Sequence, residues 1–355
     1  MNLSEALLPF VYRSASWKYA VMSRRLFFIL VLVTLLTSGC AVTEIAQDQF
    51  VSIKNFTLGE FYLDNRKYRD GIAHFQQETV ENPSDPKAFY YLGRCYLAED
   101  KNRDGLAALK KAVQLDPGHA DSHFWLGVAY AANGNPKAER KSYETALALD
   151  PDHVQALVYL GHNRFEAKDY RRALTYYNKA LAEVPDEPQA LYNRGLICRH
   201  YKRTPEEIQA WRVFLENFPQ GAHARQAAQY LNMYGVFDYR NHLIGIRSIT
   251  LGKIRFEPLT AKLDKESRKT LDFLAKVFEK QTRFELHVLA YQKNNKALAK
   301  ARARSIRRYI TERNRRIGSN RIKISWFDVP EKIVVGKKRF REDAAITFFT
   351  IKGKV

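Results

Sequence analysis

Five prolines stand 34 residues apart in this chain of 355 residues, and the spacing constrains the fold more than any other feature. They are Pro83, Pro117, Pro151, Pro185 and Pro219. A fixed period of this length indicates a stack of similar helix–turn–helix units, because each unit can bury its apolar face only against its neighbours. Proline suits the end of a unit, since it cannot continue a helix. We therefore expect about half of the chain to form an all-α stack.

Two further positions of the unit repeat when the count starts at Ser52. The eighth position is always glycine: Gly59, Gly93, Gly127, Gly161 and Gly195. Position 24 is always large: Phe75, Leu109, Tyr143, Tyr177 and Trp211. A glycine lets two helices approach closely, and a large side chain fills the remaining space. This pattern resembles the tetratricopeptide repeat (TPR) family. The resemblance implies an all-α solenoid of five repeats over residues 52–236, closed by a capping helix after Pro219.

The resemblance also implies a binding face, because positions 5, 9 and 12 of the first helix in each TPR usually line the concave side. We expect an aromatic groove there for an extended peptide or an amphipathic helix of a protein partner. Ordinary packing of the aromatic side chains at position 5 fits the composition equally well. The predicted groove residues are Phe56, Tyr90, Arg94, Phe124, His162, Phe165, Tyr192 and Arg199.

The N-terminal region has the pattern of an export signal. Arg24 and Arg25 precede an apolar stretch over residues 26–36, and small residues lead to Cys40. The apolar stretch is short for a membrane span. It resembles a bacterial lipoprotein signal, which implies a signal peptide over residues 1–39, a lipid such as palmitate on Cys40, and a lipidated linker over 40–51. Residues 1–21 add nothing to a signal, so Met22 is an alternative start.

The residue after the cysteine indicates where such a lipoprotein resides. Ala41 differs from the aspartate that retains many lipoproteins at the inner membrane. The resemblance therefore implies the periplasmic side of the cell outer membrane, with the lipid as the contact to the membrane. A plain secretory peptide, an anchor that is never removed, and a twin-arginine signal around Arg24 and Arg25 are the alternatives.

The positive charge of the chain, +20 in all, is concentrated at the C-terminal end. Residues 238–355 hold 30 Lys and Arg against 12 Asp and Glu, whereas residues 40–237 have a net charge of −1. Such a field attracts anionic lipid, acidic glycan or an acidic protein, although a solvated surface explains it as well. The export signal argues against nucleic acid. The residues that we assign to anion or glycan binding are Arg302, Arg304, Arg308, Lys338 and Arg339.

Residues 237–355 alternate between strand and helix patterns. We predict strands at 251–256, 284–291, 322–327 and 345–351 and helices at 263–280 and 297–309. This β-α-β-α-β-β order implies an α/β domain whose helices cover one face of the sheet. The stretches 254–256, 271–275, 288–291 and 301–306 resemble an OmpA-like C-terminal domain, which implies peptidoglycan binding through a Thr-Asp pair and an arginine. Arg302 matches that arginine, but Gln292 and Lys293 replace Thr-Asp, and a lysine repels the ammonium group of the ligand.

The sequence contains no glycine-rich phosphate-binding loop, no His-Glu-x-x-His motif and no serine nucleophile elbow. We therefore predict no catalysis, no cofactor and no metal site. Cys95 and Cys198 are expected to be buried and free of disulfides. The acidic pair Glu206-Glu207 is interpreted as an exposed partner of a helix dipole. The sequence favours an outer-membrane scaffold or assembly factor. A peptidoglycan-binding anchor, or an adaptor whose basic domain docks an acidic protein, is the alternative.

Overall fold

A computed structural model describes residues 40–353, with the backbone alone described for residues 40–50. The predicted signal peptide, residues 1–39, lies outside the described residues, and so does the side chain of Cys40. The chain divides into two compact units, one that ends at Pro185 and one that begins at Asp186. We describe each unit by itself.

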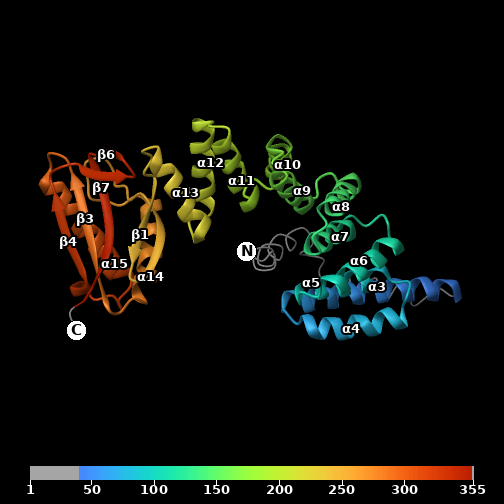
Figure 1. Cartoon of the computed structure of the whole chain (residues 1–355). Coiled ribbons are helices and arrows are strands. Elements are labelled where there is room, and N and C mark those ends of the chain that lie inside the picture. Colours follow the sequence, from blue (N-terminus) through green and yellow to red (C-terminus); the bar gives the residue numbers. More distant parts are fainter. Residues whose placement is uncertain (1–39, 354–355) are drawn as a thin grey trace. The chain divides into compact units, whose positions relative to one another are not determined.

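The first unit consists of helix pairs (Figure 1). The segment 40–51, expected to be a linker, forms the first half of α3, and α5, α7 and α9 begin where the repeat count places units. The helices are α3 Cys40–Asp64, α4 Tyr68–Glu81, α5 Pro86–Ala98, α6 Asn102–Leu115, α7 Ala120–Ala132, α8 Pro136–Leu149, α9 Val154–Glu166 and α10 Tyr170–Glu183.

The repeated glycine and the large residue at position 24 meet inside the helix pairs, as predicted. A Cβ atom on Gly127 would lie 2.3 Å from the ring of Tyr143, and one on Gly161 would lie 2.6 Å from the ring of Tyr177. Both tyrosines are fully buried. The first repeat departs from this rule, because Gly59 lies against Tyr91 of the next repeat. A side chain at these glycines would therefore push the paired helices apart.

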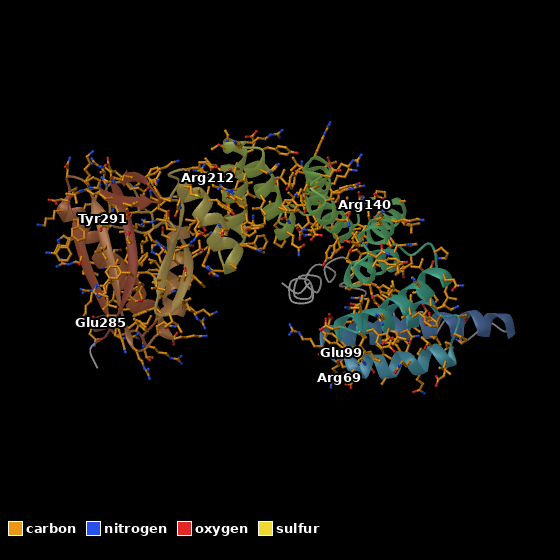
Figure 2. All side chains as sticks on the ribbon, in the orientation of Figure 1. Arg69, Glu99, Arg140, Arg212, Glu285 and Tyr291 are labelled. Carbon is orange, nitrogen blue, oxygen red and sulfur yellow. The ribbon has the colours of Figure 1, made fainter. Side chains whose placement is uncertain are left out.

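The turn inside each pair also repeats. One residue in each repeat adopts a left-handed backbone conformation, with φ between 55° and 72°. These residues are Arg66, Asp100, Gly134, Lys168 and Lys202, again 34 residues apart. Glycine occupies this position in one unit alone, so the sequence carries little sign of the turn geometry. Polar contacts then link successive pairs, as between Arg69 and Glu99 at 3.0 Å; both residues are labelled in Figure 2.

The second unit joins the last helices to the α/β region. α13 is the predicted capping helix, and its Arg225 carbonyl accepts a hydrogen bond from Asn241 in β1 at 2.9 Å. The division between the compact units, at 185/186, lies within the predicted solenoid, and the domain boundary at 236/237 stays a prediction. The elements are α11 Pro188–His200, α12 Thr204–Asn217, α13 Gly221–Met233, β1 Tyr239–Ile244, β2 Arg247–Gly252, α14 Lys265–Glu279, β3 Phe284–Gln292, α15 Lys296–Arg313, η1 Ser319–Arg321, β4 Ile322–Phe327, β5 Glu331–Val335, β6 Lys338–Glu342 and β7 Ala344–Lys352.

A three-stranded sheet in the order β4-β3-β7 forms the centre of the α/β region. β3 runs parallel to β4 and antiparallel to β7. β1 lies beside β7, since His242 bonds the carbonyl of Phe348 at 3.1 Å, and it forms a hairpin with β2. Alternate residues of β3, including Leu286 and Val288, are fully buried against α14 and α15. The helices thus cover one face of the sheet, as expected.

Three parts of this region differ from the sequence prediction. The first predicted strand, 251–256, is displaced: β2 ends at Gly252, and Phe256 forms an isolated bridge with Leu263. β1 and the β5–β6 hairpin were not predicted. Their sequences are rich in charged and polar residues and form strands because pairing and long-range contacts favour them over their local propensity. The alternation of strands and helices is otherwise as predicted, while the OmpA-like identity stays a prediction.

Candidate functional site

The predicted groove residues of the first unit differ in depth. Phe56 on α3 is 49% exposed, and His162 and Phe165 on α9 are half-buried. Tyr90 and Phe124 are 6% and 1% exposed, so their rings lie inside the repeats. Packing therefore accounts for the aromatic residues at position 5 in the second and third repeats, and the groove prediction rests on the more accessible residues.

Phe124 shows how the packing works. Its ring lies 5.5 Å from Trp125, 5.7 Å from Tyr143 and 5.3 Å from Tyr159, with the last two rings on α8 and α9. Aromatic rings at these separations attract one another edge-to-face or when tilted. Phe124 thus connects three consecutive helices, which is a core role.

Arg94 is enclosed in the same way. Its side chain on α5 donates a hydrogen bond to Glu60 of α3 at 3.1 Å, and the guanidinium lies 4.7 Å from the ring of Trp125 on α7. Tyr91 also donates to Glu60, at 3.0 Å. The charge is matched and surrounded by aromatic rings, with Arg94 9% exposed. Arg94 therefore links the first three repeats.

In the second unit, Arg199 has a similar structural role. It donates a hydrogen bond to Glu207 at 2.9 Å and stacks on Tyr230 of α13 at 4.2 Å. Glu207 has no exposed surface and also accepts hydrogen bonds from Trp211 at 3.2 Å and Tyr234 at 2.7 Å. The interpretation of Glu207 as an exposed dipole partner is wrong, because its carboxylate joins α11, α12 and the start of the segment after α13. Tyr192, the remaining groove residue, is half-buried.

The residues matched to the peptidoglycan grip have partners within the chain. Arg302 on α15 donates hydrogen bonds to the side chain of Gln292 and to the carbonyl of Thr260, and it lies 4.8 Å from the ring of Phe256. Burial lowers the pKa of its guanidinium. Lys293 forms an ion pair with Asp343 at 3.3 Å. The structure thus brings Arg302 and Gln292 together and gives both side chains partners within the chain.

The other predicted anion-binding residues lie on two separate elements. Arg304 and Arg308 are exposed on α15, which packs on β3 and β4. Lys338 and Arg339 are exposed on β6, and Lys338 donates a hydrogen bond to the carbonyl of Met233 at 3.2 Å. These four residues therefore come from two different elements, α15 and β6.

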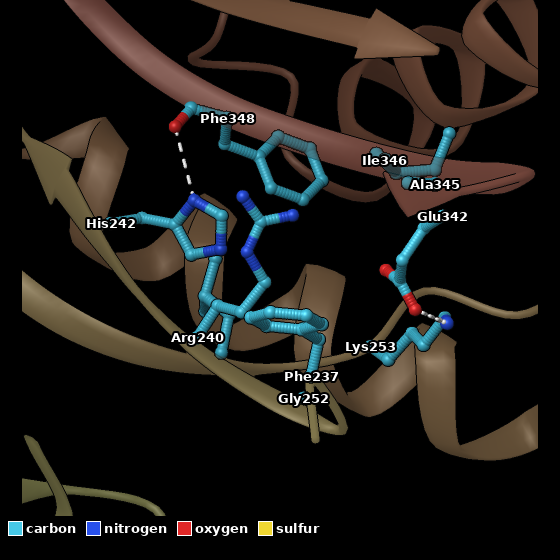
Figure 3. Close-up of a pocket in the computed structure, with 10 residues that line it drawn as sticks. Phe237, Arg240, His242, Gly252, Lys253, Glu342, Ala345, Ile346 and Phe348 are labelled. Atoms are coloured by element: carbon cyan, nitrogen blue, oxygen red, sulfur yellow. Dashed lines mark hydrogen bonds and ion pairs between the residues drawn. The ribbon is translucent and has the colours of Figure 1, made fainter. Parts of the chain in front are cut away.

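A small cavity between β1, β2 and β7 is lined by His242, a histidine whose pKa differs from the usual value (Figure 3). Its volume is about 10 Å³, room for roughly one water molecule. Burial lowers the pKa of His242 to about 4, so its Nδ1–H donates to the carbonyl of Phe348 from a neutral ring. Lys253 and Glu342 form an ion pair at the rim. This cavity is a feature of the core.

Within residues 40–353, no group of three or more His, Cys, Asp and Glu side chains is placed to hold a metal ion. Over the same residues, every helix is too short or too polar to cross a bilayer. Cys95 and Cys198 are buried and free, as predicted.

Comparison with known proteins agrees with the helix pairs. The tetratricopeptide repeat model matches residues 56–102, 96–154 and 158–222. No curated protein sequence matches the chain. Among solved structures, Pseudomonas aeruginosa PilF is 15% identical over 54% of this chain and 88% of its own, with a TM-score of 0.50.

Two other solved structures are less similar in three dimensions. PilW, a type IV pilus biogenesis factor, is 16% identical over 52% of this chain and 88% of its own, with a TM-score of 0.47. MamA is 21% identical over 45% of this chain and 93% of its own, with a TM-score of 0.42. At such identities the likeness concerns the fold alone. The match of the family model supports tetratricopeptide repeats within residues 56–222.

Proposed function

We propose that this protein is a non-enzymatic scaffold or assembly factor of the bacterial cell envelope. In this proposal the repeats hold a protein partner, a lipid on Cys40 anchors the chain to the periplasmic side of the outer membrane, and the basic C-terminal region contacts an anionic surface. The tetratricopeptide-repeat array is the observation that carries the protein-binding part, because stacked repeats present extended surfaces to other proteins. The signal pattern and the charge of residues 238–355 support the other parts.

The first helix of the array offers an accessible pair of apolar side chains. Ile53 and Phe56 lie three residues apart on α3, and they are 52% and 49% exposed. Residues at this spacing share one side of a helix. We propose that a partner covers this side of α3, with Phe56 as the principal contact.

Crosslinking in cells tests the partner. A Phe56→Ala variant should lose the partner that the unchanged chain captures, since removing a buried aromatic anchor typically costs about 2 kcal/mol or more of binding. Val80→Ala is the matched control, because Val80 is 81% exposed on α4, the second helix of the same repeat. Equal capture by both variants would place the partner elsewhere.

Fractionation tests the anchor. A Cys40→Ser variant should stay unprocessed, lose incorporation of a palmitate analogue and no longer fractionate as a mature lipoprotein of the outer membrane. A variant with unchanged processing and membrane association would refute lipidation at Cys40. Separating inner from outer membranes then tests the effect of Ala41.

Sedimentation with purified sacculi separates the anionic-surface proposal from a peptidoglycan anchor. Arg302 already donates to Gln292 and Thr260, so we expect binding that weakens with salt and is unchanged in Arg302→Ala. Loss of binding in Arg302→Ala at moderate salt would favour the peptidoglycan anchor instead.

A further inference from the structure

The outer edge of the C-terminal sheet is a strand with one neighbour. Among the strands described within residues 40–353, β4 pairs with β3 alone, and Figure 1 shows it at the edge of its sheet. Such a strand directs alternate N–H and C=O groups away from the sheet. Another extended chain can pair with those groups.

A row of cations on α15 runs beside this edge. Lys300 fixes its position, because the Nζ atom lies 5.0 Å from the ring centroid of Trp326 in β4. Lys296 and Arg304 stand four residues before and after Lys300, and Arg307 follows one turn later, so these residues share one side of the helix. We call Lys296, Lys300, Arg304 and Arg307 the edge row. Like charges at this spacing destabilise a helix.

Cations on the opposite side of α15, and directly after its end, form ion pairs with carboxylates. Arg313 pairs with Asp272 at 3.5 Å, and Arg316 pairs with Glu279 at 2.9 Å. Over residues 40–353, by contrast, no residue of the edge row forms an ion pair. The chain thus pairs Arg313 and Arg316 with its own carboxylates and leaves the edge row, beside the free strand, without them.

The other face of β4 carries an apolar contact. Phe327 is 38% exposed and stacks on Tyr291 of β3, with ring centroids 5.0 Å apart. Tyr291 and Glu285, both on β3, are labelled in Figure 2. Side chains of a strand alternate between the faces of a sheet. A strand added to β4 would therefore direct one set of side chains to the edge row and the other set to Phe327.

We propose that β4 and the edge row bind an extended segment of another protein in which acidic and apolar residues alternate. Carboxylates would pair with the edge row, apolar side chains would cover Phe327, and the backbone would extend the sheet beyond β4. The proposal rests on the proposed function, because it names the chemistry of a partner for the basic region. A second copy of this chain fits poorly, since symmetric pairing of two β4 strands brings two edge rows together.

An anionic lipid or glycan surface is the competing occupant, and it differs in one respect. It could neutralise the edge row, but it would leave the N–H and C=O groups of β4 without partners. Strand addition needs both the charges and an unbroken backbone of the bound segment, and a test can separate these requirements.

Fluorescence anisotropy with the full-length chain provides this test at about 0.15 M salt. The probe is a labelled peptide of four Glu-Val repeats, and the comparison probe has four Glu-Pro repeats, which carry equal charge but lack alternate backbone donors. We expect the Glu-Pro peptide to bind more than about tenfold more weakly. Lys300→Glu with Arg304→Glu should weaken Glu-Val binding by more than about tenfold, because like charges then face each other.

The matched control reverses two exposed lysines, one on the neighbouring helix α14 and one directly after it, Lys276→Glu with Lys280→Glu, and changes the net charge equally. This variant should bind the Glu-Val peptide as the unchanged chain does. Equal binding of both peptides, or equal loss in both variants, would show general charge attraction and overturn strand addition. Absence of binding would overturn it too. Vesicles with anionic lipid that bind through the same two residues would favour the membrane. If Phe56→Ala still lost its partner and Cys40→Ser still lost its lipid, the proposed function would stand and only the proposal for β4 would fail.

Discussion

The repeats of the first unit and the α/β region of the second are stabilised by contacts of different range. In the repeats, the partners are close in sequence: Gly127 meets Tyr143, and Arg94 meets Glu60 of the preceding repeat. In the α/β region, Arg240 of β1 bonds Glu331 across 91 residues of sequence. Damage to a repeat should therefore stay near that repeat, whereas damage to the long-range contacts should release several strands together.

The two regions also differ in the balance of charge. Residues 40–237 are almost neutral, and a buried carboxylate there, Glu207, has a complete set of donors. Residues 238–355 carry +18, and although Glu331 is equally well bonded, the edge row has no acidic partner among residues 40–353. The buried carboxylates Glu207 and Glu331 are thus both paired, and the surplus charge of the second region is the basis of the contact that we propose with a partner outside the chain.

Removal of the Glu331 carboxylate should have the largest effect on stability. Glu331 is 5% exposed and accepts two hydrogen bonds from Arg240, at 2.7 and 3.0 Å, and another from Thr347. Glu331→Ala leaves the partly buried guanidinium of Arg240 without its carboxylate, and breaking such a pair costs up to about 3–5 kcal/mol. Hydrogen exchange should show faster exchange in β1, β5, β6 and β7 together and unchanged protection in α4–α9.

Glu257→Ala is the control for this substitution, because Glu257 forms an exposed ion pair with Lys262. Its cost should be below about 1 kcal/mol. If Glu331→Ala also exposed the amides of α4–α9, the separation between the two regions would be wrong.

Acid should destabilise the α/β region through His242. Burial lowers the folded-state pKa to about 4, whereas the unfolded chain has the usual value of 6.5. The stabilising contribution is therefore complete above pH 6.5 and is lost as the pH falls from 6.5 to 4. At about 1.4 kcal/mol per pKa unit, the loss is of the order of 3 kcal/mol.

Denaturant unfolding at several pH values checks this prediction. His242→Asn keeps a hydrogen-bond donor but cannot titrate, so its unfolding free energy should fall less between pH 6.5 and 4 than that of the unchanged chain. The difference should be confined to the transition of the α/β region. Equal pH dependence of both chains would contradict a buried, neutral His242.

Gly127→Ala should have an intermediate effect, localised in one repeat. The added Cβ would lie 2.3 Å from the buried ring of Tyr143, so the helices must separate or the ring must move. Overpacking of this kind costs about 1–3 kcal/mol, reduced by about 1 kcal/mol from the better helix propensity of alanine. Thermal denaturation and exchange in α7 and α8 measure it.

Gly118→Ala is the matched control, because its Cβ would meet no atom closer than 3.5 Å. We expect little change there. A Gly127→Ala chain as stable as the control would mean that the glycine at position 8 does not set the helix spacing.

The sequence predicted the repeats well because their contacts recur. The period located the helix pairs, and the glycine at position 8 predicted the close contact that Gly127 and Gly161 make. β1 and the β5–β6 hairpin escaped prediction, since residues such as Arg240 and Arg339 obscure the alternation of a strand, and pairing across the fold decides their conformation.

The candidate site was predicted less completely. Position 5 placed Tyr90 and Phe124 on the expected helices, but their depth depends on rings from adjacent helices, which spacing alone does not reveal. The partners of Arg199 and Arg302 were missed for the same reason. Tertiary packing brings Glu207 to Arg199 and Gln292 to Arg302, and the spacing in the sequence does not reveal it. The unmatched charge of the C-terminal region was the signal that sequence did carry.

The exposed pair between Arg69 and Glu99 should have the smallest effect and sets the lower limit of the comparison. Its Nε–Oε2 distance, 3.0 Å, is close to the 3.1 Å between Arg94 and Glu60, but Arg69 is 87% exposed, whereas the side chain of Arg94 is 10% exposed. Water and salt screen the exposed pair, so Arg69→Ala should cost less than about 1 kcal/mol and nothing measurable in 1 M salt, where the Debye length is about 3 Å. Arg94→Ala should cost clearly more, because Glu60 loses its partner and three aromatic rings lose a packed cation. If Arg69→Ala and Arg94→Ala lowered the free energy of unfolding equally, burial would not strengthen the ion pairs between adjacent repeats. The enclosure of Arg94 argues against that result.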